Sequence, residues 1–539
     1  MDASKGTLPV MRIMNPLFSV AKRTLKWPVF AVLAITFSCK AGWAATYTAA
    51  GCSQSQVQAA IASEQSSPAD GDVITIPSGT CTWTTGISQS FSHSVTIQGA
   101  GAVHAGSGGS SITGVDTTVI IDNLPGYNHS VMQFNAASGK SLRVTGIAIL
   151  ENSSSTATSN AMLNIGGAST SVRVDHCHFY SYMTGNKDVH ISILGVADHN
   201  FFDALAGIIT NDLSFENGAN WNGVDDQGYA DASWADTDHF GTSRFFFAED
   251  NQFNNGWVSD CAVGGRYVLR YNTMKNVYGT ANHGLNPGRV RGCRAAEVYG
   301  NTFTASSGAQ QSTAYSNNSG PALVWGNTTT WYRFLVNLDV TRKSNVPYGM
   351  IATPNGWGYC GTNFNGKGSA WDKNSNAATG YTCMDGPGRG AGDMVTGTFP
   401  NVVNQATGTI AWPHQVLDPI YVFANTYNPA GYSSQGITAD QSGMLTDNQD
   451  YYQQFGPYGE PGTFDGSKGI GQGLFAGISP ACTVGVGYWA TDRNTLYVCN
   501  PANTWTSYYS PYTYPHPLTA GQTAVNPPNP PTGLSATVN

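Results

Sequence analysis

The chain has 539 residues, with 25 Lys and Arg against 33 Asp and Glu, so its formal net charge is −8 at pH 7. This balance argues against general nucleic-acid binding, because the phosphate backbone selects basic surfaces. Charged residues make up only 11% of the chain, against roughly 25% in typical soluble proteins. Hydrophobic residues at 41% can supply a core, which excludes a disordered chain.

Residues 1–44 are predicted to be a secretory signal peptide. Basic residues precede an apolar run from Val29 to Phe37, and Gly42-Trp-Ala44 offers small residues for cleavage. The run is too short for a transmembrane span. We therefore expect an extracellular protein, with the periplasm or the cell surface as alternatives.

Local patterns predict a helix followed by strands. Residues 53–63 have helical character, with Val57, Ala60 and Ile61 on one side. Alternating apolar residues predict strands in the following ranges: 72–77, 95–99, 119–122, 142–150, 323–325, 332–338 and 421–425.

Five segments can be aligned as repeats, each an alternating strand followed by a polar turn and an aromatic residue or Met. They are Val172–Phe179, Gly195–Phe202, Phe246–Phe253, Tyr267–Met274 and Ala296–Phe303. Repeats at such intervals are typical of solenoids, in which neighbouring units bury a continuous core.

The alignment predicts which side chains face inward. Apolar residues lie three positions before and two positions after each turn position. The turn positions are Cys177, Asn200, Asn251, Asn272 and Asn301. An Asn at such a bend tolerates left-handed backbone and can hydrogen-bond the next unit. Strand alternation sends the column two before the turn toward water. That column contains Asp175, Asp198, Glu249, Arg270 and Tyr299.

The N-terminal helix, the segment Gly71-Asp-Val-Ile-Thr-Ile-Pro77 and the segment Val95-Thr-Ile-Gln-Gly99 resemble the opening of secreted proteins of the pectate-lyase-like superfamily. The resemblance implies an all-β fold, a right-handed parallel β-helix (solenoid) whose N-terminal helix caps the stack. Such a cap protects exposed sheet ends from aggregation. We expect the β-helix, with inserted loops, over residues 45–440.

The C-terminal part is expected to differ from the solenoid. Aromatic density rises after residue 440, and Gly487–Asp492 with Leu496–Cys499 predicts a hairpin. The Pro/Tyr-rich segment Tyr508–Pro517 is expected to pack as a clamp. Residues 441–518 thus form an aromatic-rich C-terminal cap, and 519–539 a Pro-rich linker.

Cysteine spacing suggests disulfides, as an oxidising compartment favours. Proximity pairs most of the cysteines and leaves Cys177 as a buried free thiol. The expected pairs are Cys52–Cys81, Cys261–Cys293, Cys360–Cys383 and Cys482–Cys499.

Charge is segregated along the chain. From Asp198 to Asp250 there are eleven acidic residues and one base, whereas Arg266 to Arg294 contains six bases and no acid. One interpretation is mutual neutralisation, with Glu249 against Arg270 as a surface ion pair. The other is a site for an acidic polysaccharide. There Asp175, Asp198 and Glu249 would hold Ca²⁺ through oxygen ligands, and Arg266, Arg270, Arg291 and Trp257 would contact the polymer.

The basic segment also resembles a pectate-lyase motif. Arg289-Val-Arg-Gly-Cys-Arg294 stands between two Asn turns, as an R-x-P-x-x-R motif does in that family. The resemblance implies Arg289 as the base that removes a proton next to a uronate carboxylate, with Arg294 as the second motif Arg. Arg291 replaces the motif Pro, which weakens the match. His283 is the easier base on pKa grounds.

A polysaccharide lyase acting by β-elimination is the favoured function, and two alternatives stay open. A glycoside hydrolase needs carboxylates that flank one groove, for which Asp225, Asp226, Asp236 and Asp238 are candidates. A non-catalytic glycan-binding or adhesion protein would present Trp221, Trp234 and Trp257 to sugar rings. A monomer is expected in each case.

Overall fold

The structure is a computed structural model. It describes residues 44–126, 129–152, 161–182, 187–205, 211–223, 230–277, 279–284, 291–306, 311–340, 385–392, 415–428, 435–439 and 445–519. The chain divides into two compact units, Met1–Ala41 and Gly42–Asn539. The described residues all belong to the second unit. In that part of the chain, no helix is long and apolar enough to cross a membrane.

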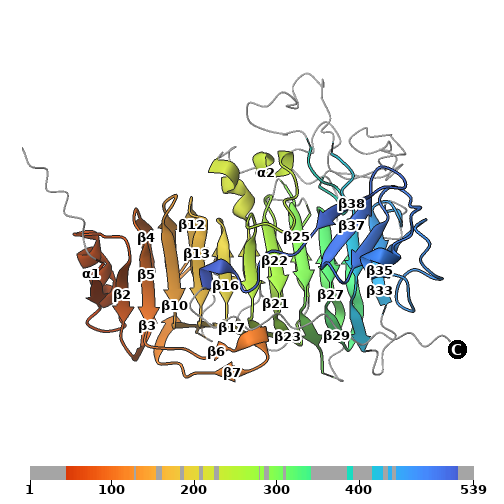
Figure 1. The fold of residues 1–539 in the computed structure, drawn as a ribbon. Coiled ribbons are helices and arrows are strands. Elements are labelled where there is room, and N and C mark those ends of the chain that lie inside the picture. Colours follow the sequence, from red (N-terminus) through yellow and green to blue (C-terminus); the bar gives the residue numbers. More distant parts are fainter. Residues whose placement is uncertain are drawn as a thin grey trace, which may run out of the picture. The chain divides into compact units, whose positions relative to one another are not determined.

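The described chain is an all-β parallel β-helix built from three parallel sheets (Figure 1). Each turn of the stack passes from sheet A to sheet B and then to sheet C. Sheet A contains β1 (Thr46–Thr48), β2 (Asp72–Ile76), β5 (Val95–Gly99), β10 (Ser141–Thr145), β13 (Ser171–Asp175), β16 (Gly195–Asp198), β19 (Phe246–Glu249), β22 (Arg266–Arg270), β25 (Ala295–Tyr299), β28 (Ala322–Trp325), β31 (Ile420–Phe423) and β34 (Tyr451–Gln453).

Sheets B and C stack in the same chain order. Sheet B contains β3 (Gly79–Trp83), β8 (Thr118–Asp122), β11 (Ala148–Glu151), β14 (His178–Ser181), β17 (Phe201–Ala204), β20 (Gln252–Asn254), β23 (Thr273–Lys275), β26 (Thr302–Thr304), β29 (Thr328–Thr330) and β32 (Thr426–Asn428). Sheet C contains β4 (Ile87–Phe91), β9 (Met132–Ala136), β12 (Leu163–Gly167), β15 (Lys187–Ile191), β18 (Asn211–Phe215), β21 (Trp257–Cys261), β24 (Thr280–Asn282), β27 (Gln311–Asn317), β30 (Tyr332–Leu338) and β33 (Gln435–Ala439).

Helices and short elements lie outside these sheets. Helix α1 (Gln54–Gln65) contacts β1 and β2 at the N-terminal end of the stack, and α2 (Asp231–Ala235) belongs to an insertion (Figure 1). Helix α1 confirms the predicted helix, and its function as a cap stays a prediction. The remaining elements are β6 (His104–Ala105), β7 (Ile112–Thr113), η1 (Ser107–Gly109), η2 (Asn217–Gly223), η6 (Phe475–Gly477) and η7 (Pro517–Thr519).

The predicted repeats are confirmed as strands of sheet A with their following turns. Each Asn amide bonds the next rung: Asn200 N donates to Asn251 Oδ1 at 2.9 Å, and Asn251 N donates to Asn272 Oδ1 at 2.9 Å. The ladder continues through Asn301, Asn327 and Asn425. The residue before each of these turns has a positive φ, as in His199 at 56° and Gly300 at 66°, which is why the bend ends the strand.

Gly146 explains one difference from the predicted strands. The single strand expected over 142–150 is two strands, β10 and β11, because Gly146 has a φ of 68° and turns the chain between sheets A and B. Ile147 and Ile149 are buried in the core on the far side of this turn. A continuous apolar run can therefore cross a turn between two sheets, because the strands on both sides of the turn direct apolar side chains into the interior of the β-helix (the lumen).

The outer face of sheet A is a second core, and this corrects the expected exposure of the column two before the turn. Asp175, Asp198, Glu249, Arg270 and Tyr299 are fully buried. Phe247, Val268 and Trp325 on this face pack in one cluster with C-terminal residues such as Trp489 and Tyr509. Alternation does send the column away from the lumen, but a later part of the chain covers it.

The covering segment begins in a small sheet of β35 (Ile470–Gly473), β36 (Gly487–Ala490), β37 (Thr495–Cys499) and β38 (Trp505–Tyr509). Strands β36 and β37 are antiparallel, which confirms the predicted hairpin. The Pro/Tyr segment then packs on sheet A, where Arg270 donates to Tyr512 O at 2.8 Å and His516 N donates to Glu249 Oε1 at 2.7 Å. The predicted clamp is thus confirmed.

Three of the expected disulfides are present in the described residues: Cys52–Cys81, Cys261–Cys293 and Cys482–Cys499. Cys177 is a buried free thiol, as predicted. Cys360 and Cys383 lie outside the described residues. Three disulfides favour an oxidising, non-cytoplasmic compartment.

Candidate functional site

Sheet C carries the group of acid and base side chains that best resembles a reactive site. In β15, β18 and β21 the residues Ile191, Phe215 and Cys261 belong to the lumen core. The residues before them are His190, Ser214 and Asp260, which stand in register on neighbouring strands. Alternation therefore directs these three side chains to the outer face of the sheet.

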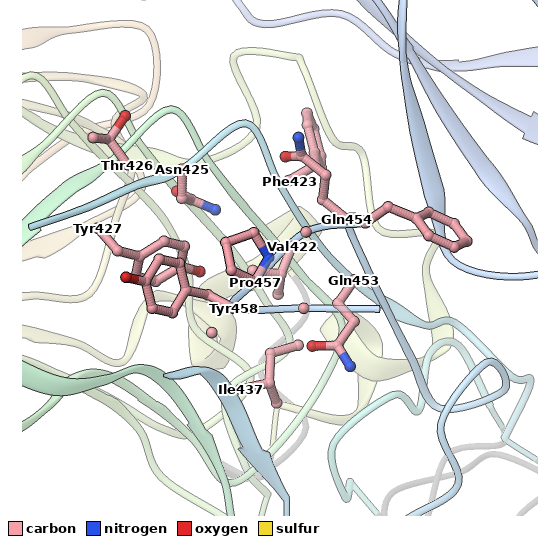
Figure 2. Close-up of a pocket in the computed structure, with 14 residues that line it drawn as sticks. Val422, Phe423, Asn425, Thr426, Tyr427, Ile437, Gln453, Gln454, Pro457 and Tyr458 are labelled. Carbon is pink, nitrogen blue, oxygen red and sulfur yellow. The ribbon is translucent and has the colours of Figure 1, made fainter. Parts of the chain in front are cut away.

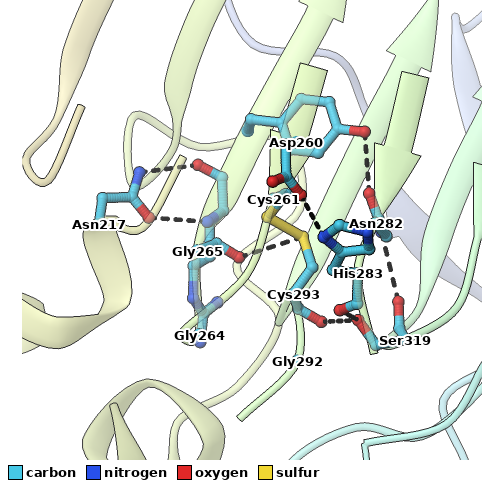
Figure 3. The surroundings of a disulfide bond; sticks show 12 residues. Asn217, Asp260, Cys261, Gly264, Gly265, Asn282, His283, Gly292, Cys293 and Ser319 are labelled. Atoms are coloured by element: carbon cyan, nitrogen blue, oxygen red, sulfur yellow. Dashed lines mark hydrogen bonds and ion pairs between the residues drawn. A yellow bond between two sulfur atoms is a disulfide. The ribbon is translucent and has the colours of Figure 1, made fainter. Parts of the chain in front are cut away.

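Asp260 and His283 form an ion pair on this face. His283 Nδ1 lies 2.6 Å from Asp260 Oδ1, and the His283 side chain is 31% exposed whereas that of Asp260 is buried (Figure 3). A buried carboxylate that binds one ring nitrogen fixes the orientation and tautomer of a histidine. His283 is thus an oriented, solvent-accessible base, as a proton-abstracting site requires.

The Cys261–Cys293 disulfide holds this pair in place. His283 N donates to Cys261 O at 2.7 Å, and Cys293 N donates to His283 O at 3.0 Å. Ser319 Oγ donates to His283 O at 2.8 Å from the next turn of the stack (Figure 3). The backbone on both sides of His283 is therefore tied to covalently linked rungs, which gives the base a rigid support.

A second charged group lies beside the pair. Glu216 follows β18 directly, and its carboxylate lies 3.4 Å from His190 Nε2 and 3.5 Å from Lys187 Nζ. Glu216 and His283 occupy corresponding register positions two rungs apart. Neighbouring strands are spaced about 4.8 Å apart, so the two Cα atoms should be about 10 Å apart. Two carboxylates, those of Glu216 and Asp260, thus stand on this sheet between basic side chains.

A groove of about 560 Å³ opens beside Glu216. Its lining includes Ser192 and Asn217, which adjoin the Glu216 position, and Trp221, Arg244 and His516. Arg244 stacks over the Trp221 ring, with its Cζ 4.2 Å from the ring centroid. Hydroxyl, amide and cationic groups in one groove suit a polar, anionic ligand such as an acidic sugar chain.

The predicted arginines are buried and bind the protein's own groups. Arg291 donates to Asp231 at 2.6 Å and to Asp385 at 2.8 Å. Arg266 donates to the carbonyls of Thr237 and Asp238, both at 2.6 Å. With Arg270 and Arg294, all four side chains have no exposed surface. These contacts hold insertions and the C-terminal segment onto the stack. The substrate-binding and catalytic roles of these arginines stay predictions that the contacts do not favour.

The predicted roles of the tryptophans and of Arg289 differ in how far the described residues bear on them. Arg289 lies outside the described residues, so its role stays a prediction. Trp257 is part-buried at the start of β21, the strand that ends at the candidate site. Trp221 and Trp234 are buried in the insertion, so neither is displayed to sugar rings as the adhesion hypothesis expected.

The predicted calcium ligands are occupied by cations of the protein. Asp175 accepts from Arg143 at 2.6 Å, and Asp198 accepts from Arg173 at 2.7 Å. Burial alone would raise the pKa of Asp175, but hydrogen bonds from Arg143 and His176 outweigh it and hold the pKa well below its usual range. Glu249 binds Arg270, which matches the neutralisation interpretation except that the pair is buried. The calcium role stays a prediction that these contacts do not favour.

Two of the carboxylates proposed for a hydrolase, Asp236 and Asp238, accept hydrogen bonds from different side chains of the protein. Asp236 accepts from Trp221 Nε1 at 3.0 Å, and Asp238 accepts from Tyr508 at 3.2 Å. Burial alone would raise the pKa of Asp236, but hydrogen bonds from His239 and Trp221 outweigh it and lower the pKa. Asp225 and Asp226 lie outside the described residues.

Sequence reasoning found His283 but missed Asp260, Glu216, His190 and Lys187. A signal was present for Asp260, Glu216 and His190, because each stands next to a buried core residue of a sheet C strand. The sheet A repeats carry the regular Asn turn, whereas sheet C strands follow loops of variable length and have no such marker. Their register could not be aligned from the sequence.

A smaller hollow of about 220 Å³ lies near the C-terminal end of the stack (Figure 2). The Tyr427 and Tyr458 rings pack against each other in its lining, with ring centroids 4.9 Å apart (Figure 2). Among the described residues, its lining contains Gln and Asn amides but no Asp, Glu, Lys, Arg or His side chain. It can therefore contact a sugar, but the described lining has no carboxylate–imidazole pair like Asp260 and His283.

Comparison with protein-family models, with curated proteins and with solved structures gave no match to this chain. The function is therefore argued from the residues on sheet C.

Proposed function

We propose that this is a secreted carbohydrate-active β-helix protein, a polysaccharide lyase that cleaves a uronate-containing polymer by β-elimination. The observation that carries the proposal is the oriented, partly exposed His283 paired with buried Asp260 on sheet C, which also holds Lys187 and His190. The predicted signal peptide and the three disulfides support secretion, and the parallel β-helix is compatible with activity on carbohydrates.

The reaction needs a base next to a stabilised carbanion. His283 would take the proton on the carbon next to the uronate carboxylate through Nε2, since Asp260 binds Nδ1. Asp260 then stabilises the imidazolium that forms. The C–O bond to the leaving sugar breaks as the carbon–carbon double bond forms, and the leaving oxygen takes a proton from solvent or from the imidazolium.

Positive charge on the same face would make the proton removable. A uronate carboxylate that is neutralised by cations stabilises negative charge on the neighbouring carbon. Lys187 and His190 stand beside Glu216, and Arg244 lines the adjoining groove. A uronate carboxylate that took the place of Glu216 beside Lys187 and His190 would gain the same charge pairing, which supports a uronate substrate over a neutral one.

Ultraviolet absorbance of unsaturated uronate ends, measured on a panel of acidic polysaccharides, tests the reaction. His283→Ala and Asp260→Asn should each lower kcat by at least about 100-fold, the usual contribution of a general base. His178→Ala is a matched control, because His178 also binds a carboxylate, Asp116, at 2.8 Å but on sheet B. It should leave kcat within about threefold, well inside the effect of a lost base.

Two results would reject the assignment. Full activity in His283→Ala with loss in Arg289→Ala would make Arg289 the base. An absence of unsaturated ends on the whole panel, with glycan binding retained in an affinity assay, would leave a binding protein rather than a lyase.

A glycoside hydrolase is a second candidate because Glu216 and Asp260 stand on neighbouring rungs, offset by two residues. Their Cα atoms are about 8 Å apart by strand geometry, a spacing from which two carboxylates can flank a glycosidic bond. New reducing ends without unsaturated products would favour this reaction over elimination. Glu216→Gln should then abolish activity.

A further inference from the structure

Three ligand-type side chains converge at the N-terminal end of the stack, far in sequence from the candidate lyase site. Glu64 lies in the last turn of α1, Asp72 is the first residue of β2, and His93 is in the turn between β4 and β5. Glu64 and Asp72 have no exposed surface and His93 is 6% exposed. One potential ligand atom from each residue lies within 4.8 Å of the other two.

The hydrogen bonds of this cluster leave ligand positions without a donor. Asp72 accepts from the backbone N–H groups of Ala45 at 2.7 Å and Ala69 at 2.8 Å. Glu64 Oε2 accepts from Gln65 at 2.7 Å. Within the described residues, Glu64 Oε1 and both ring nitrogens of His93 have no partner with hydrogen-bond geometry, although His93 Nε2 points at Glu64 Oε1. Each carboxylate oxygen carries a second lone pair that can bind a cation.

The composition of the cluster also suits a cation. Two buried carboxylates stand beside a single imidazole. An uncompensated charge in the interior is costly. A divalent cation bound by two carboxylates and a neutral imidazole would bring the cluster to zero charge.

We propose that Glu64, Asp72 and His93 form a structural binding site for a divalent transition-metal ion of the Zn²⁺ class. Carboxylate oxygen and imidazole nitrogen are both zinc ligands, whereas Ca²⁺ and Mg²⁺ take oxygen ligands. Tetrahedral coordination with bonds near 2.0–2.1 Å needs ligand atoms about 3.3 Å apart. The three side chains, whose ligand atoms lie within 4.8 Å of one another, would rearrange around the ion to reach this spacing. Water or a backbone carbonyl would complete the coordination.

The ion would link α1 to the first rungs of the β-helix. Its three ligands come from α1, β2 and the turn before β5. Strands β2 and β5 are already paired by backbone hydrogen bonds, and α1 contacts β2 and follows Cys52, which is linked to Cys81. A metal that binds the folded state alone stabilises it by mass action. The proposed site is independent of the sugar chemistry on sheet C, so either assignment can fail without the other.

The test uses the full mature protein without a His-tag, stripped with a chelator and dialysed. Titration with ZnCl₂ by calorimetry should show one ion per chain, and zinc at about 100 times Kd should raise Tm by about 2–3 °C. CaCl₂ should give neither signal. Glu64→Gln and His93→Gln should abolish zinc binding and the shift in Tm. His129→Ala is the matched control, because it removes a histidine that pairs with one carboxylate, Asp122 at 3.1 Å, and it should keep both.

Stripped wild-type protein that binds no zinc overturns the proposal. Zinc binding that is unchanged in folded Glu64→Gln also overturns it, because the ion would then lie elsewhere. Where the variants do not fold, X-ray absorption of the zinc-loaded wild-type protein decides. A shell of nitrogen and oxygen with a single imidazole supports the site, and sulfur ligands or several imidazoles reject it.

Discussion

Arg270 and Glu249 form a fully buried ion pair between neighbouring strands of sheet A, with Arg270 Nε 2.7 Å from Glu249 Oε2. The same guanidinium donates to the carbonyls of Tyr512 at 2.8 Å and Thr513 at 2.9 Å. Glu249 accepts in turn from the backbone N–H of His516. One ion pair thus joins two rungs of the solenoid to a segment more than two hundred residues later in the chain.

Replacement of Arg270 by Met should destabilise the protein by about 3–5 kcal/mol, because Glu249 would stay buried without its cation. The free energy of unfolding from urea titration measures the effect. Lys140→Met serves as the control, since Lys140 pairs with Asp70 at the exposed surface, where an ion pair contributes about 0–1 kcal/mol. Equal losses in the two variants would show that the buried pair is not an anchor.

Loss of one ladder amide should also be costly. Asn251→Ala removes the acceptor of Asn200 N–H and the donor to Ala197 O, both at 2.9 Å in the interior. Buried polar groups left without a partner cost about 1–3 kcal/mol each, so we expect a loss of about 2–5 kcal/mol in urea unfolding. Asn428→Ala, which removes an exposed amide on sheet B, should change stability by less than about 0.5 kcal/mol. A small loss of stability in Asn251→Ala would mean that water replaces the hydrogen bonds of the missing amide.

The repeats could be predicted because their information is local. Each sheet A strand alternates and ends at a turn with a left-handed residue, and Asn272 or Asn301 marks the position in the sequence itself. The same alternation places Glu249 and Arg270 on the outer face. It cannot reveal whether another segment covers that face, so the residues expected in water lie in a second core.

The candidate site was harder to predict for a related reason. His283 could be recognised by its chemistry, but its partner Asp260 lies 23 positions earlier on a strand without a repeated marker. The arginines were predicted to bind substrate or act in catalysis because charged residues are rare in this chain. In a structure with few charges, those charges are used to fix insertions and the C-terminal segment to the stack, as Arg291 does with Asp231 and Asp385.

Cys177 should be inert toward thiol reagents in the native protein. Burial raises the pKa of the Cys177 thiol to about 12, so the reactive thiolate is scarce at pH 8 and the sulfur is inaccessible. Mass spectrometry after treatment with a maleimide should find Cys177 unmodified under native conditions and modified in denaturant. Rapid modification of the folded protein would show that this rung opens on its own.

Glu297 should make the protein less stable as the pH rises from 4.5 to 7. Burial raises its pKa from 4.5 to about 7, although its oxygens accept from Gly241 N–H at 2.7 Å and Tyr509 O–H at 2.9 Å. The folded state holds the proton of Glu297 more tightly than the unfolded state does. The contribution of protonated Glu297 to the free energy of unfolding is therefore complete below pH 4.5 and is lost as the pH rises through 7. The difference corresponds to about 3 kcal/mol.

The variant Glu297→Gln isolates this contribution, because its amide keeps the shape of the protonated carboxyl. Urea unfolding of both proteins is measured at intervals from pH 4.5 to 7. The free energy of unfolding of the variant, relative to that of the wild type, should increase by about 3 kcal/mol across this range. All other titrating groups are common to both proteins and cancel in the comparison. Parallel curves would mean that Glu297 is ionised in the fold at neutral pH, and its contacts with Gly241 and Tyr509 would then be charge-assisted.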